Sequence, residues 1–542
     1  MSVDLQSLDI SVIALYFIVV FGIAWWASRR EKESASASAD YFLAGRNTGW
    51  FVIGASIFAS NIGSEHLIGL TGSGFAEGLP VAQFEIYAGV ILLLLGWVFV
   101  PIYLRTGVYT MPEFLERRYS ENTRMYLSVI SIIAYVLTKI SVTIYAGGVV
   151  FEVIGVDFWV GVILLVIATG VYTVFGGLKA VIYTDMIQMF VLIGGGVAVT
   201  LSGLYMLGGV NEMIAIVNQG AEMNHQESFF NLWRDSDNPN YPWTGVLFGA
   251  PILGIWYWCT DQFIVQRVLA AKDISNARRG TIFAGFLKIL PLFIFVFPGV
   301  VAFALVQKGM LTVDQPNSTL PAMVREVLPV GLRGLMIAGI FAALMSSLSS
   351  VFNSCSTLIT WDLYKKFNPQ ASERKLVLVG QMTTVTLVVL GLAWIPFMGI
   401  FSDQLFLYLQ SVQAYIAPPI AAVFLFGVFN RRINSYGAMA CLLTGFFLGL
   451  FMFALQIKKD LLNGVILDFA SINFLHFALL LFVICSLVLV TVSWMTPAPS
   501  IIKVESVTYH NFQEIKSGSS SLQVALSVLL LGAIFALWII FS

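Results

Sequence analysis

Seven charged residues lie inside long apolar stretches of the sequence, where charged side chains are rare. Four are acidic and three are basic, namely Glu65, Glu85, Asp185, Asp261, Lys139, Arg267 and Lys288. A charge at membrane depth is costly unless it faces a partner or a polar cavity. These positions therefore indicate a polar pathway or binding site within an otherwise apolar protein.

Two groups of small polar residues suggest where an ion would bind. The run from Ala59 to Ser64 interrupts an apolar stretch, and four serines lie close together in another, at Ser346, Ser347, Ser349 and Ser350. Sodium is a hard cation that prefers oxygen ligands, and an unwound helix leaves backbone carbonyls free. Ala59 and Ile62 would supply two such carbonyls. From the residues alone, serines that bond back to their own helix are a slightly better interpretation.

The composition defines the class of protein. Of 542 residues, 58% are hydrophobic and 11% are charged, and the net charge is -1. An ordinary soluble domain has about 25% charged residues, so this chain lacks the charges to cover several soluble domains. Several runs reach the roughly 18 apolar residues that span a bilayer. We therefore predict an all-α polytopic membrane protein that lies in a lipid bilayer and binds no nucleic acid, since basic residues are not in excess.

We predict about 14 transmembrane helices, at 10–28, 49–72, 81–103, 125–154, 159–176, 181–207, 245–269, 280–306, 330–360, 376–397, 404–428, 437–456, 473–495 and 521–541. If Arg29 faces the cytoplasm, loops on that side hold 20 Lys and Arg residues and loops on the other side hold 6. Cytoplasmic loops carry the excess of Lys and Arg. Both termini are therefore predicted to be extracytoplasmic, in a multi-pass protein of the cell membrane.

Helix-breaking residues occur near the middle of two predicted spans. One span contains the run from Ala59 to Ser64, and the span 245–269 contains Gly249, Pro251 and Gly254. Interrupted helices at matching places in two halves of a chain indicate a transporter site. Because the two spans stand five apart, the second half would be an inverted repeat of the first. Close packing of helices at the glycines is the alternative explanation.

This pattern divides the chain into five regions. We expect a first helix with a cytoplasmic loop, inverted repeat one, an extracellular loop, inverted repeat two and peripheral C-terminal helices, at 1–48, 49–207, 208–244, 245–428 and 429–542 respectively.

Several motifs resemble those of the sodium:solute symporter family, and within it those of the sodium/glucose cotransporters. The resemblance runs from about residue 10 to residue 500 and is carried by Asp40 to Arg46, Gly176 to Asp185, Gln266 to Lys272, Gly427 to Gly445, Trp256 to Gln262 and Tyr415 to Pro419. It implies a five-plus-five inverted-repeat (LeuT-like) core with two broken helices. It also implies that sodium is the coupling ion.

The resemblance assigns sodium ligands that the residues alone leave open. It implies a first site formed by Ala59, Ile62, Ala343, Ser346 and Ser347. Members that couple two ions have a second site, which would correspond here to Ser60, Asp185, Ser347, Ser349 and Ser350. The alternative for Asp185 is a carboxylate at a cytoplasmic helix end, paired with Lys179.

A sugar site needs hydrogen-bonding groups for the hydroxyls and aromatic faces for the ring. Polar and aromatic residues of this kind are spread over several spans, but each alone is better explained as packing or as a structural ion pair. The resemblance implies that they act together as a substrate site of Asn61, His66, Phe84, Glu85, Tyr257, Trp258, Lys288, Phe406 and Gln410, with Tyr257 as the inner gate. The animal pattern has Trp and Asn where Ile86 and Tyr87 stand here, which leaves the exact sugar open.

These observations predict a secondary active symporter that couples sodium entry to uptake of a glucose- or galactose-type hexose, with two sodium ions per sugar. A sodium symporter for myo-inositol or sialic acid, and an uncoupled sugar sensor or channel, are the alternatives. We expect no enzymatic activity, because no zinc-protease motif or nucleophile elbow is present, and no cofactor apart from the sodium ions. The sequence does not define an oligomeric state.

Overall fold

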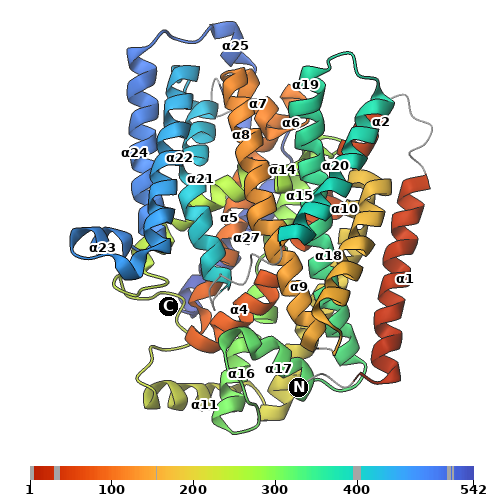
Figure 1. Ribbon diagram of the computed structural model, residues 1–542. Coiled ribbons are helices and arrows are strands. Elements are labelled where there is room, and N and C mark those ends of the chain that lie inside the picture. Colours follow the sequence, from red (N-terminus) through yellow and green to blue (C-terminus); the bar gives the residue numbers. More distant parts are fainter. Residues whose placement is uncertain (1–4, 30–36, 154, 395–404, 510–513, 516–517) are drawn as a thin grey trace.

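The computed structural model describes residues 5–29, 37–153, 155–394, 405–509, 514–515 and 518–542. These residues form helices joined by loops (Figure 1), and the bridges between extended segments in this part of the chain are the isolated pairs Thr48–Ala271 and Arg234–Pro242. The prediction of an all-α protein is confirmed.

The helices of the first half of the chain are long and apolar, with short connecting helices. They are α1 (Ser7–Arg29), α2 (Ala37–Leu43), α3 (Trp50–Asn61), α4 (Ser64–Glu77), α5 (Gln83–Leu94), α6 (Val100–Thr106), α7 (Met111–Arg118), α8 (Glu121–Ala134), α9 (Ser141–Val153), α10 (Phe158–Leu207) and α11 (Val210–Met223), with 3-10 turns η1 (Ala44–Arg46) and η2 (Leu79–Ala82) and π-helical segments η3 (Leu95–Phe99) and η4 (Tyr135–Ile140).

The second half of the chain also consists of long apolar helices with short connecting helices. Its helices are α12 (Trp243–Phe248), α13 (Ala250–Gly254), α14 (Gln262–Leu269), α15 (Ile274–Leu287), α16 (Phe297–Gln307), α17 (Thr319–Glu326), α18 (Leu332–Leu358), α19 (Lys365–Phe367), α20 (Glu373–Trp394), α21 (Leu405–Phe429), α22 (Ser435–Ile457), α23 (Val465–Ala470), α24 (Phe474–Met495), α25 (Ile501–Glu505) and α27 (Ser521–Ile540), with π-helical segments η5 (Ile255–Thr260), η6 (Leu292–Val296) and η8 (Ile359–Tyr364) and 3-10 turns η7 (Pro316–Ser318) and η10 (Lys459–Leu461).

Within the described residues, ten helices are long and apolar enough to cross a membrane, or eleven if the bent pair α3–α4 counts as one span. The chain is therefore a multi-pass membrane protein. The predicted number of 14 spans stays a prediction: 125–154 and 245–269 are each divided among shorter helices, and the predicted spans 159–176 and 181–207 lie within the single helix α10.

The helix α10 nevertheless folds back on itself where the sequence predicts a loop. Fifty residues of straight helix would extend about 75 Å, far beyond the roughly 30 Å of a hydrocarbon core. Gly177 interrupts the helix with a φ of 52°. On either side of it, the Tyr172 hydroxyl donates to the carbonyl of Met345 and Asp185 accepts from Ser346. Two positions thirteen residues apart reach adjacent residues of α18 only if the chain reverses at Gly177.

The first predicted broken helix is confirmed. Helices α3 and α4 meet at an angle of 62°. Ile62 has an extended backbone (φ -77°, ψ 94°), and the amide of Gly63 donates to Nδ1 of His66 at 3.4 Å. In a continuous helix that amide would donate to Ala59, so the break removes the helical partner of the Ala59 carbonyl.

The second break lies at a different residue from those predicted. Gly249 keeps helical angles and donates to the Gly245 carbonyl at 2.7 Å, and Pro251 lies in the first turn of α13, where proline is tolerated. The chain is instead extended at Asp261 (φ -76°, ψ 126°), between η5 and α14. Its carboxylate caps α14 by accepting from the Phe263 amide at 3.2 Å. A side-chain cap, rather than a glycine or proline, makes this break.

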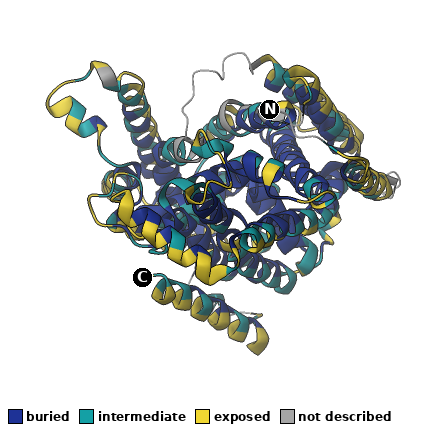
Figure 2. Cartoon of the chain, turned by 90° about the horizontal axis from the view of Figure 1, so that it is seen from below, coloured by how far each residue is buried: buried dark blue, intermediate teal, exposed yellow. Residues whose placement is uncertain are grey.

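Helix α18 lies at the centre of the molecule and the C-terminal helices lie at its edge. Every residue of α18 from Met336 to Leu358 is buried. Helix α27 instead buries one stripe, at Gln523, Ser527, Leu530 and Ile534, which is the spacing of a single helix face. Figure 2 shows the same gradient, with buried residues in the middle and exposed ones on the outer helices. The exposed side chains of α27 are largely apolar, as a lipid-facing helix requires.

The two ends of the described chain lie on the same side of the molecule (Figure 1). Near the N-terminus, Asp9 accepts hydrogen bonds from the amides of Gly331 and Gly334, just before and within the start of α18. Near the C-terminus, the carbonyl of Phe541 accepts from the Leu232 amide. Leu232 belongs to the loop 208–244 that is predicted to be extracellular, and Gly331 and Gly334 lie at the end of the predicted span 330–360 that is predicted to face outward. The orientation of the two termini stays a prediction.

Candidate functional site

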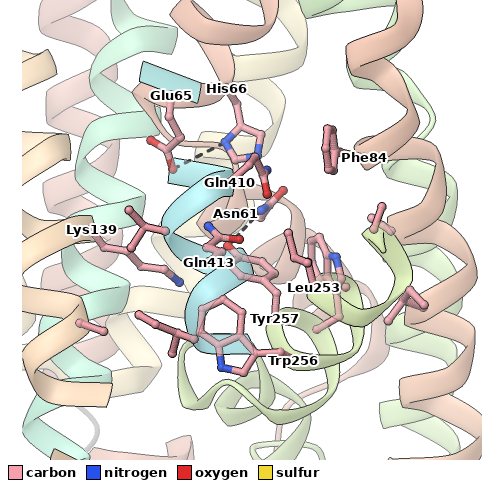
Figure 3. A pocket seen from close by; sticks show the side chains of 18 of the residues that line it. Asn61, Glu65, His66, Phe84, Lys139, Leu253, Trp256, Tyr257, Gln410 and Gln413 are labelled. Carbon is pink, nitrogen blue, oxygen red and sulfur yellow. Dashed lines mark hydrogen bonds and ion pairs between the residues drawn. The ribbon is translucent and has the colours of Figure 1, made fainter. Parts of the chain in front are cut away.

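A cavity lies beside the break between α3 and α4, and α4, α5, η4, η5 and α21 contribute to its wall (Figure 3). It brings together residues that are far apart in the sequence. Its polar and aromatic lining includes Asn61, Glu65, His66, Phe84, Glu85, Tyr87, Lys139, Trp256, Tyr257, Trp258, Gln410 and Gln413. Seven of the nine predicted substrate-site residues line it.

A buried ion pair holds one wall of this cavity. Lys288, which ends α15, donates to the carboxylate of Glu85 and to the side-chain carbonyl of Asn61. Its side chain is fully buried and that of Glu85 is 4% exposed. Lys288 therefore does not itself line the cavity but neutralises and orients two residues that do. A buried charge arranged in this way is compensated both by an opposite charge and by hydrogen bonding.

His66 links two carboxylates across the first turn of α4. Its Nε2 lies 3.5 Å from Oε1 of Glu85, and its Nδ1 lies 3.6 Å from Oε1 of Glu65. The imidazole ring is therefore held between α4 and α5, next to the amide of Gly63 at the helix break. Both hydrogen-bond donors and hydrogen-bond acceptors therefore face the cavity on this side.

Aromatic rings form another part of the wall. Tyr257 and Trp258 contact each other edge to face, with ring centroids 5.0 Å apart. The Tyr257 hydroxyl accepts a hydrogen bond from Nδ2 of Asn61 at 3.0 Å, and Nζ of Lys288 lies 5.2 Å from the Trp258 ring centroid. The rings give the cavity apolar faces. The Tyr257 hydroxyl is bonded to Asn61, and the Trp258 ring lies near Lys288, which belongs to the buried ion pair.

A second ion pair lies under the Tyr257 ring. Nζ of Lys139 lies 3.2 Å from Oδ2 of Asp261, 4.5 Å from the centroid of Tyr257 and 3.8 Å from that of Phe263. Asp261 is the extended residue at the second helix break. Both charges are unusual within apolar stretches of the sequence, but their role is not predictable from it, because nothing in the sequence pairs Asp261, just before α14, with Lys139 in η4.

The predicted first sodium site lies where the α3–α4 break meets α18. The Ser347 hydroxyl donates to the backbone carbonyl of Ser60 at 3.3 Å, so α18 contacts the end of α3 directly. Ala59, Ile62 and Ala343 are fully buried, as is Ser346. One hydroxyl of α18 and one carbonyl at the end of α3 thus lie together, next to the Ala59 carbonyl that the break leaves without a helical partner.

Three residues of the predicted second sodium site, Ser60, Asp185 and Ser350, lie in one closed polar cluster. The Asp185 carboxylate accepts from Ser346 at 2.6 Å on one oxygen, and from Ser56 at 2.6 Å and Ser60 at 3.0 Å on the other. The Ser350 hydroxyl donates to that of Ser60 at 3.2 Å. Three helices, α3, α10 and α18, thus meet at a single carboxylate.

Arg267 of α14 is the cation of this cluster. Its Nη2 lies 3.7 Å from Oδ2 of Asp185, and both side chains are 0% exposed. The guanidinium also donates to the hydroxyls of Ser350 and Ser56. The alternative that pairs Asp185 with Lys179 at a cytoplasmic helix end is therefore wrong, because Asp185 is enclosed and its partner is Arg267.

The remaining predicted residues fall in three classes. Ser349 donates to the Ser346 carbonyl of its own helix at 3.0 Å rather than to Asp185. Phe84 lines the cavity and packs against Tyr241 and Phe474. Gln410 lines it from α21, whereas the side chain of Phe406 lies outside the described residues. Ser56 and Arg267 were missed as members of the Asp185 cluster.

Comparisons with known proteins identify the family of the chain. Residues 41–445 match the model of the sodium:solute symporter family. The chain is 40% identical over 531 residues to sodium/glucose cotransporter 1 of Oryctolagus cuniculus, covering 91% of this chain and 80% of that protein. It is 40% identical over 533 residues to sodium/glucose cotransporter 4 of Mus musculus (92% and 77%) and 39% identical over 547 residues to the sodium/myo-inositol cotransporter of Canis lupus familiaris (93% and 76%).

Solved structures show a related fold. A substrate-bound, outward-open Na+-coupled sialic acid symporter superposes with a TM-score of 0.77 at 20% identity, over 92% of this chain and 100% of that one. Mhp1, a nucleobase-cation-symport-1 family transporter, superposes in a closed conformation with a TM-score of 0.51 at 14% identity, over 88% and 99%. The chain therefore shares this helical fold, and the family model and the relatives it matches are those of transporters rather than enzymes. The chain belongs to the sodium:solute symporter family.

Proposed function

We propose that this symporter couples sodium entry to uptake of a glucose- or galactose-type hexose. The observation that carries the proposal is the cavity beside the broken helix α3–α4, in which hydrogen-bonding side chains from several elements surround a space walled by Tyr257 and Trp258. The relatives of 38–40% identity that are sodium/glucose cotransporters support the same substrate class.

The lining fits the chemistry of a sugar. A hexose has hydroxyl edges, which need both donors and acceptors, and apolar ring faces, which pack on aromatic rings. Glu85 would accept from two hydroxyls, whereas Asn61 and Gln410 both donate and accept. His66 would complete the polar edge, and Phe84 would supply an aromatic face. Phe406 is proposed as a further aromatic residue of the site from the sequence resemblance alone. Such a site rejects analogues that lack a hydroxyl, because buried polar groups would be left unpaired.

Sodium would act by tying α3 to α18. In the proposed first site, the carbonyls of Ala59, Ile62 and Ala343 and the hydroxyls of Ser346 and Ser347 coordinate the ion. The contact between Ser347 and the Ser60 carbonyl supports this, because it already joins the same two elements. Bound sodium would hold the broken helix in the position that presents Asn61 and His66 to the sugar.

A second sodium ion would bind in the Asp185 cluster. We propose Ser60, Asp185, Ser347, Ser349 and Ser350 as its ligands, which gives two ions per sugar. The cluster supplies one carboxylate and several hydroxyls in a closed space. Because Arg267 now occupies the cationic position beside Asp185, binding of the ion would require the guanidinium to move away.

The proposed architecture is a five-plus-five inverted repeat, 49–207 and 245–428, within about 14 spans. The first helix (1–48), the extracellular loop (208–244) and the peripheral C-terminal helices (429–542) complete it. Both termini would face outward in the cell membrane. The transport cycle would be alternating access, in which sodium favours the outward-open state and its release inside frees the Tyr257 gate. A ligand shifts such an equilibrium only by its differential affinity for the two states.

The number of ions decides how far sugar can be concentrated. One charge moving through 100 mV yields about 2.3 kcal/mol, and a tenfold sodium gradient adds about 1.4 kcal/mol. One ion would therefore limit accumulation to several hundred-fold, because 1.4 kcal/mol is about tenfold. Two ions would raise the limit to the order of 10⁵.

The test is uptake of labelled glucose and galactose into proteoliposomes with an inward sodium gradient, compared with an equal potassium gradient. We expect accumulation of a hexose above equilibrium in sodium only. Equal uptake in both salts would indicate an uncoupled channel or sensor and would contradict the proposal.

Competition in the same vesicles defines the substrate class. Unlabelled glucose and galactose should suppress the sodium-dependent uptake, whereas proline should leave it unchanged. Stronger suppression by myo-inositol or by sialic acid than by either hexose would replace the hexose assignment with that solute, and inositol is the solute of several relatives.

A further inference from the structure

Much of the polar lining of the cavity is already engaged within the protein. Asn61 donates to the Tyr257 hydroxyl and accepts from Lys288, which also donates to Glu85. Nε2 of His66 lies 3.5 Å from the other oxygen of Glu85. A substrate can use only the donors and acceptors that these contacts leave over. Side chains of the wall without such contacts are therefore the first candidates for further binding residues.

Two side chains of this kind lie on α21. Gln410 and Gln413 both line the cavity, and residues three apart share one face of a helix. Among the described residues, neither carboxamide has a hydrogen-bond partner. Neither is enclosed, because the enclosed polar atoms without a partner belong to other residues. Both carboxamides are therefore accessible to a ligand in the cavity.

Gln413 lies deeper along α21 than Gln410, on the side of Tyr257. In the view of Figure 3, Gln413 lies below Gln410, toward the Tyr257 side chain. An α-helix rises 1.5 Å per residue, so the two residues stand about 4.5 Å apart along the helix axis. This spacing is comparable with the width of a pyranose ring. The two carboxamides would therefore reach different hydroxyls of one sugar.

We propose that Gln413 is a specificity-determining residue that binds the sugar directly, donating to one ring hydroxyl and accepting from its neighbour. This inference rests on the proposed hexose function and adds a residue to the site. A carboxamide both donates and accepts, so one side chain can bind hydroxyls on neighbouring ring carbons. Gln410, one turn away, would bind a different hydroxyl.

This contact would make the site selective for the pattern of hydroxyls on the ring. The Gln413 carboxamide loses water when a sugar fills the cavity, and a missing hydroxyl would leave its donor or its acceptor unpaired. A site that hydrogen-bonds a hydroxyl rejects the analogue lacking it far more strongly than an apolar pocket rejects a missing methylene. A deoxy sugar that lacks the contacted hydroxyl should therefore bind weakly.

Displacement of labelled glucose from purified full-length protein in sodium tests the contact. The competitors are glucose and a set of monodeoxyglucoses, each of which lacks one hydroxyl. They are measured for the wild type, for Gln410→Met and for Gln413→Met, in which the side chain keeps its length but cannot form these hydrogen bonds. Gln219→Met, at an exposed position of α11, is the matched control.

We expect glucose to bind Gln413→Met about fivefold more weakly than the wild type, since neutral hydrogen bonds are lost. One or two monodeoxyglucoses that lack neighbouring hydroxyls should lose clearly less affinity than glucose in this variant, because part or all of the contact is already absent. The other analogues should lose the same factor as glucose. Gln410→Met should single out a different hydroxyl, and Gln219→Met should change nothing.

Three results would overturn the inference. The first is unchanged glucose affinity in Gln413→Met. The second is an equal loss for every analogue in the folded variant, because Gln413 would then only shape the cavity. The third is the same hydroxyl pattern for Gln410→Met and Gln413→Met.

Two further measurements keep these outcomes distinct. Thermal unfolding in detergent shows whether Gln413→Met is folded. If it is not, Gln413→Glu, which keeps the shape but loses the donor, should show the selective loss for the hydroxyl that accepts from the amide. Failure of the hexose function is recognised separately, because neither labelled glucose nor labelled galactose would then bind the wild type in sodium.

Discussion

The two polar regions inside this protein differ in how their charges are compensated. Around Asp185, three serine hydroxyls and the Arg267 guanidinium surround one carboxylate, and both charged side chains are 0% exposed. Around the cavity, three carboxylates face two lysines and one histidine, and Glu65 is 20% exposed with one free oxygen. The first region is closed and neutral within the protein, whereas the second is open and incomplete.

This difference suggests separate roles for the two regions: the Asp185 cluster couples sodium to movement of the helices, and the cavity recognises the sugar. A change of charge in the closed cluster acts on α3, α10, α14 and α18 together, because Asp185 belongs to α10 and residues of the other three helices contact its carboxylate. The cavity wall, in which not every hydrogen-bonding group is satisfied, is affected instead by the ligand that binds there. Substitutions in the Asp185 cluster should therefore alter stability and sodium dependence, and substitutions in the cavity should alter sugar affinity.

The largest effect is expected from breaking the Asp185–Arg267 pair. Arg267→Met or Asp185→Leu leaves the other charge buried and unpaired, which costs about 3–5 kcal/mol. Thermal unfolding in detergent should show a marked loss of stability for each single variant. The double variant should be more stable than either single one, because no uncompensated charge remains. Singles that unfold at the wild-type temperature would contradict the pairing.

Lys288→Met should come next and should act on sugar binding. It leaves Glu85 buried without its cation, and removing one member of a buried charge pair costs about 2–5 kcal/mol. Sugar displacement in sodium should weaken by about 30-fold or more. The matched control is Lys308→Met, since Lys308 forms an exposed pair with Glu212 at 3.2 Å. Equal affinities in the two variants would show that Lys288 does not support the cavity.

Tyr257→Phe should have a smaller effect. It removes the hydroxyl that accepts from Asn61 at 3.0 Å but keeps the ring, and a neutral hydrogen bond contributes about 1 kcal/mol. Sugar affinity should fall by about fivefold. Tyr205→Phe, on a side chain that is 88% exposed, should have no effect. A loss beyond about 100-fold would mean that the hydroxyl contacts the sugar directly.

Two neighbouring serines give the finest comparison. Ser347 contacts the Ser60 carbonyl of the broken helix, whereas Ser349 bonds back to its own helix. Ser347→Ala should raise the sodium concentration for half-maximal uptake severalfold, and Ser349→Ala should raise it less, because Ser347 is proposed as a ligand in both sodium sites and Ser349 only in the second. The reverse order would contradict the proposed first site.

Much of this arrangement is predictable from the sequence. Each of the seven charges within the apolar stretches lies in one or the other of the two polar regions, because a charge at membrane depth needs a partner or a cavity. The first helix break is predictable because its small polar run has few packing side chains. Local composition is enough in both cases.

The partners of these charges are less predictable. The pairing of Asp185 with Arg267 depends on how α10 packs against α14, and Lys179, which is nearer in sequence, is not the partner. The second break depends on the side-chain cap of Asp261 rather than on glycine or proline. Both features are set by tertiary contacts between distant elements, which local sequence patterns do not encode.

The most direct test of the central claim is simultaneous measurement of labelled sodium and labelled hexose fluxes in the same proteoliposomes. The two fluxes should rise and saturate together, with two sodium ions entering per sugar and with no sugar accumulation in potassium. Hexose entry that proceeds without a matching sodium flux would contradict that claim.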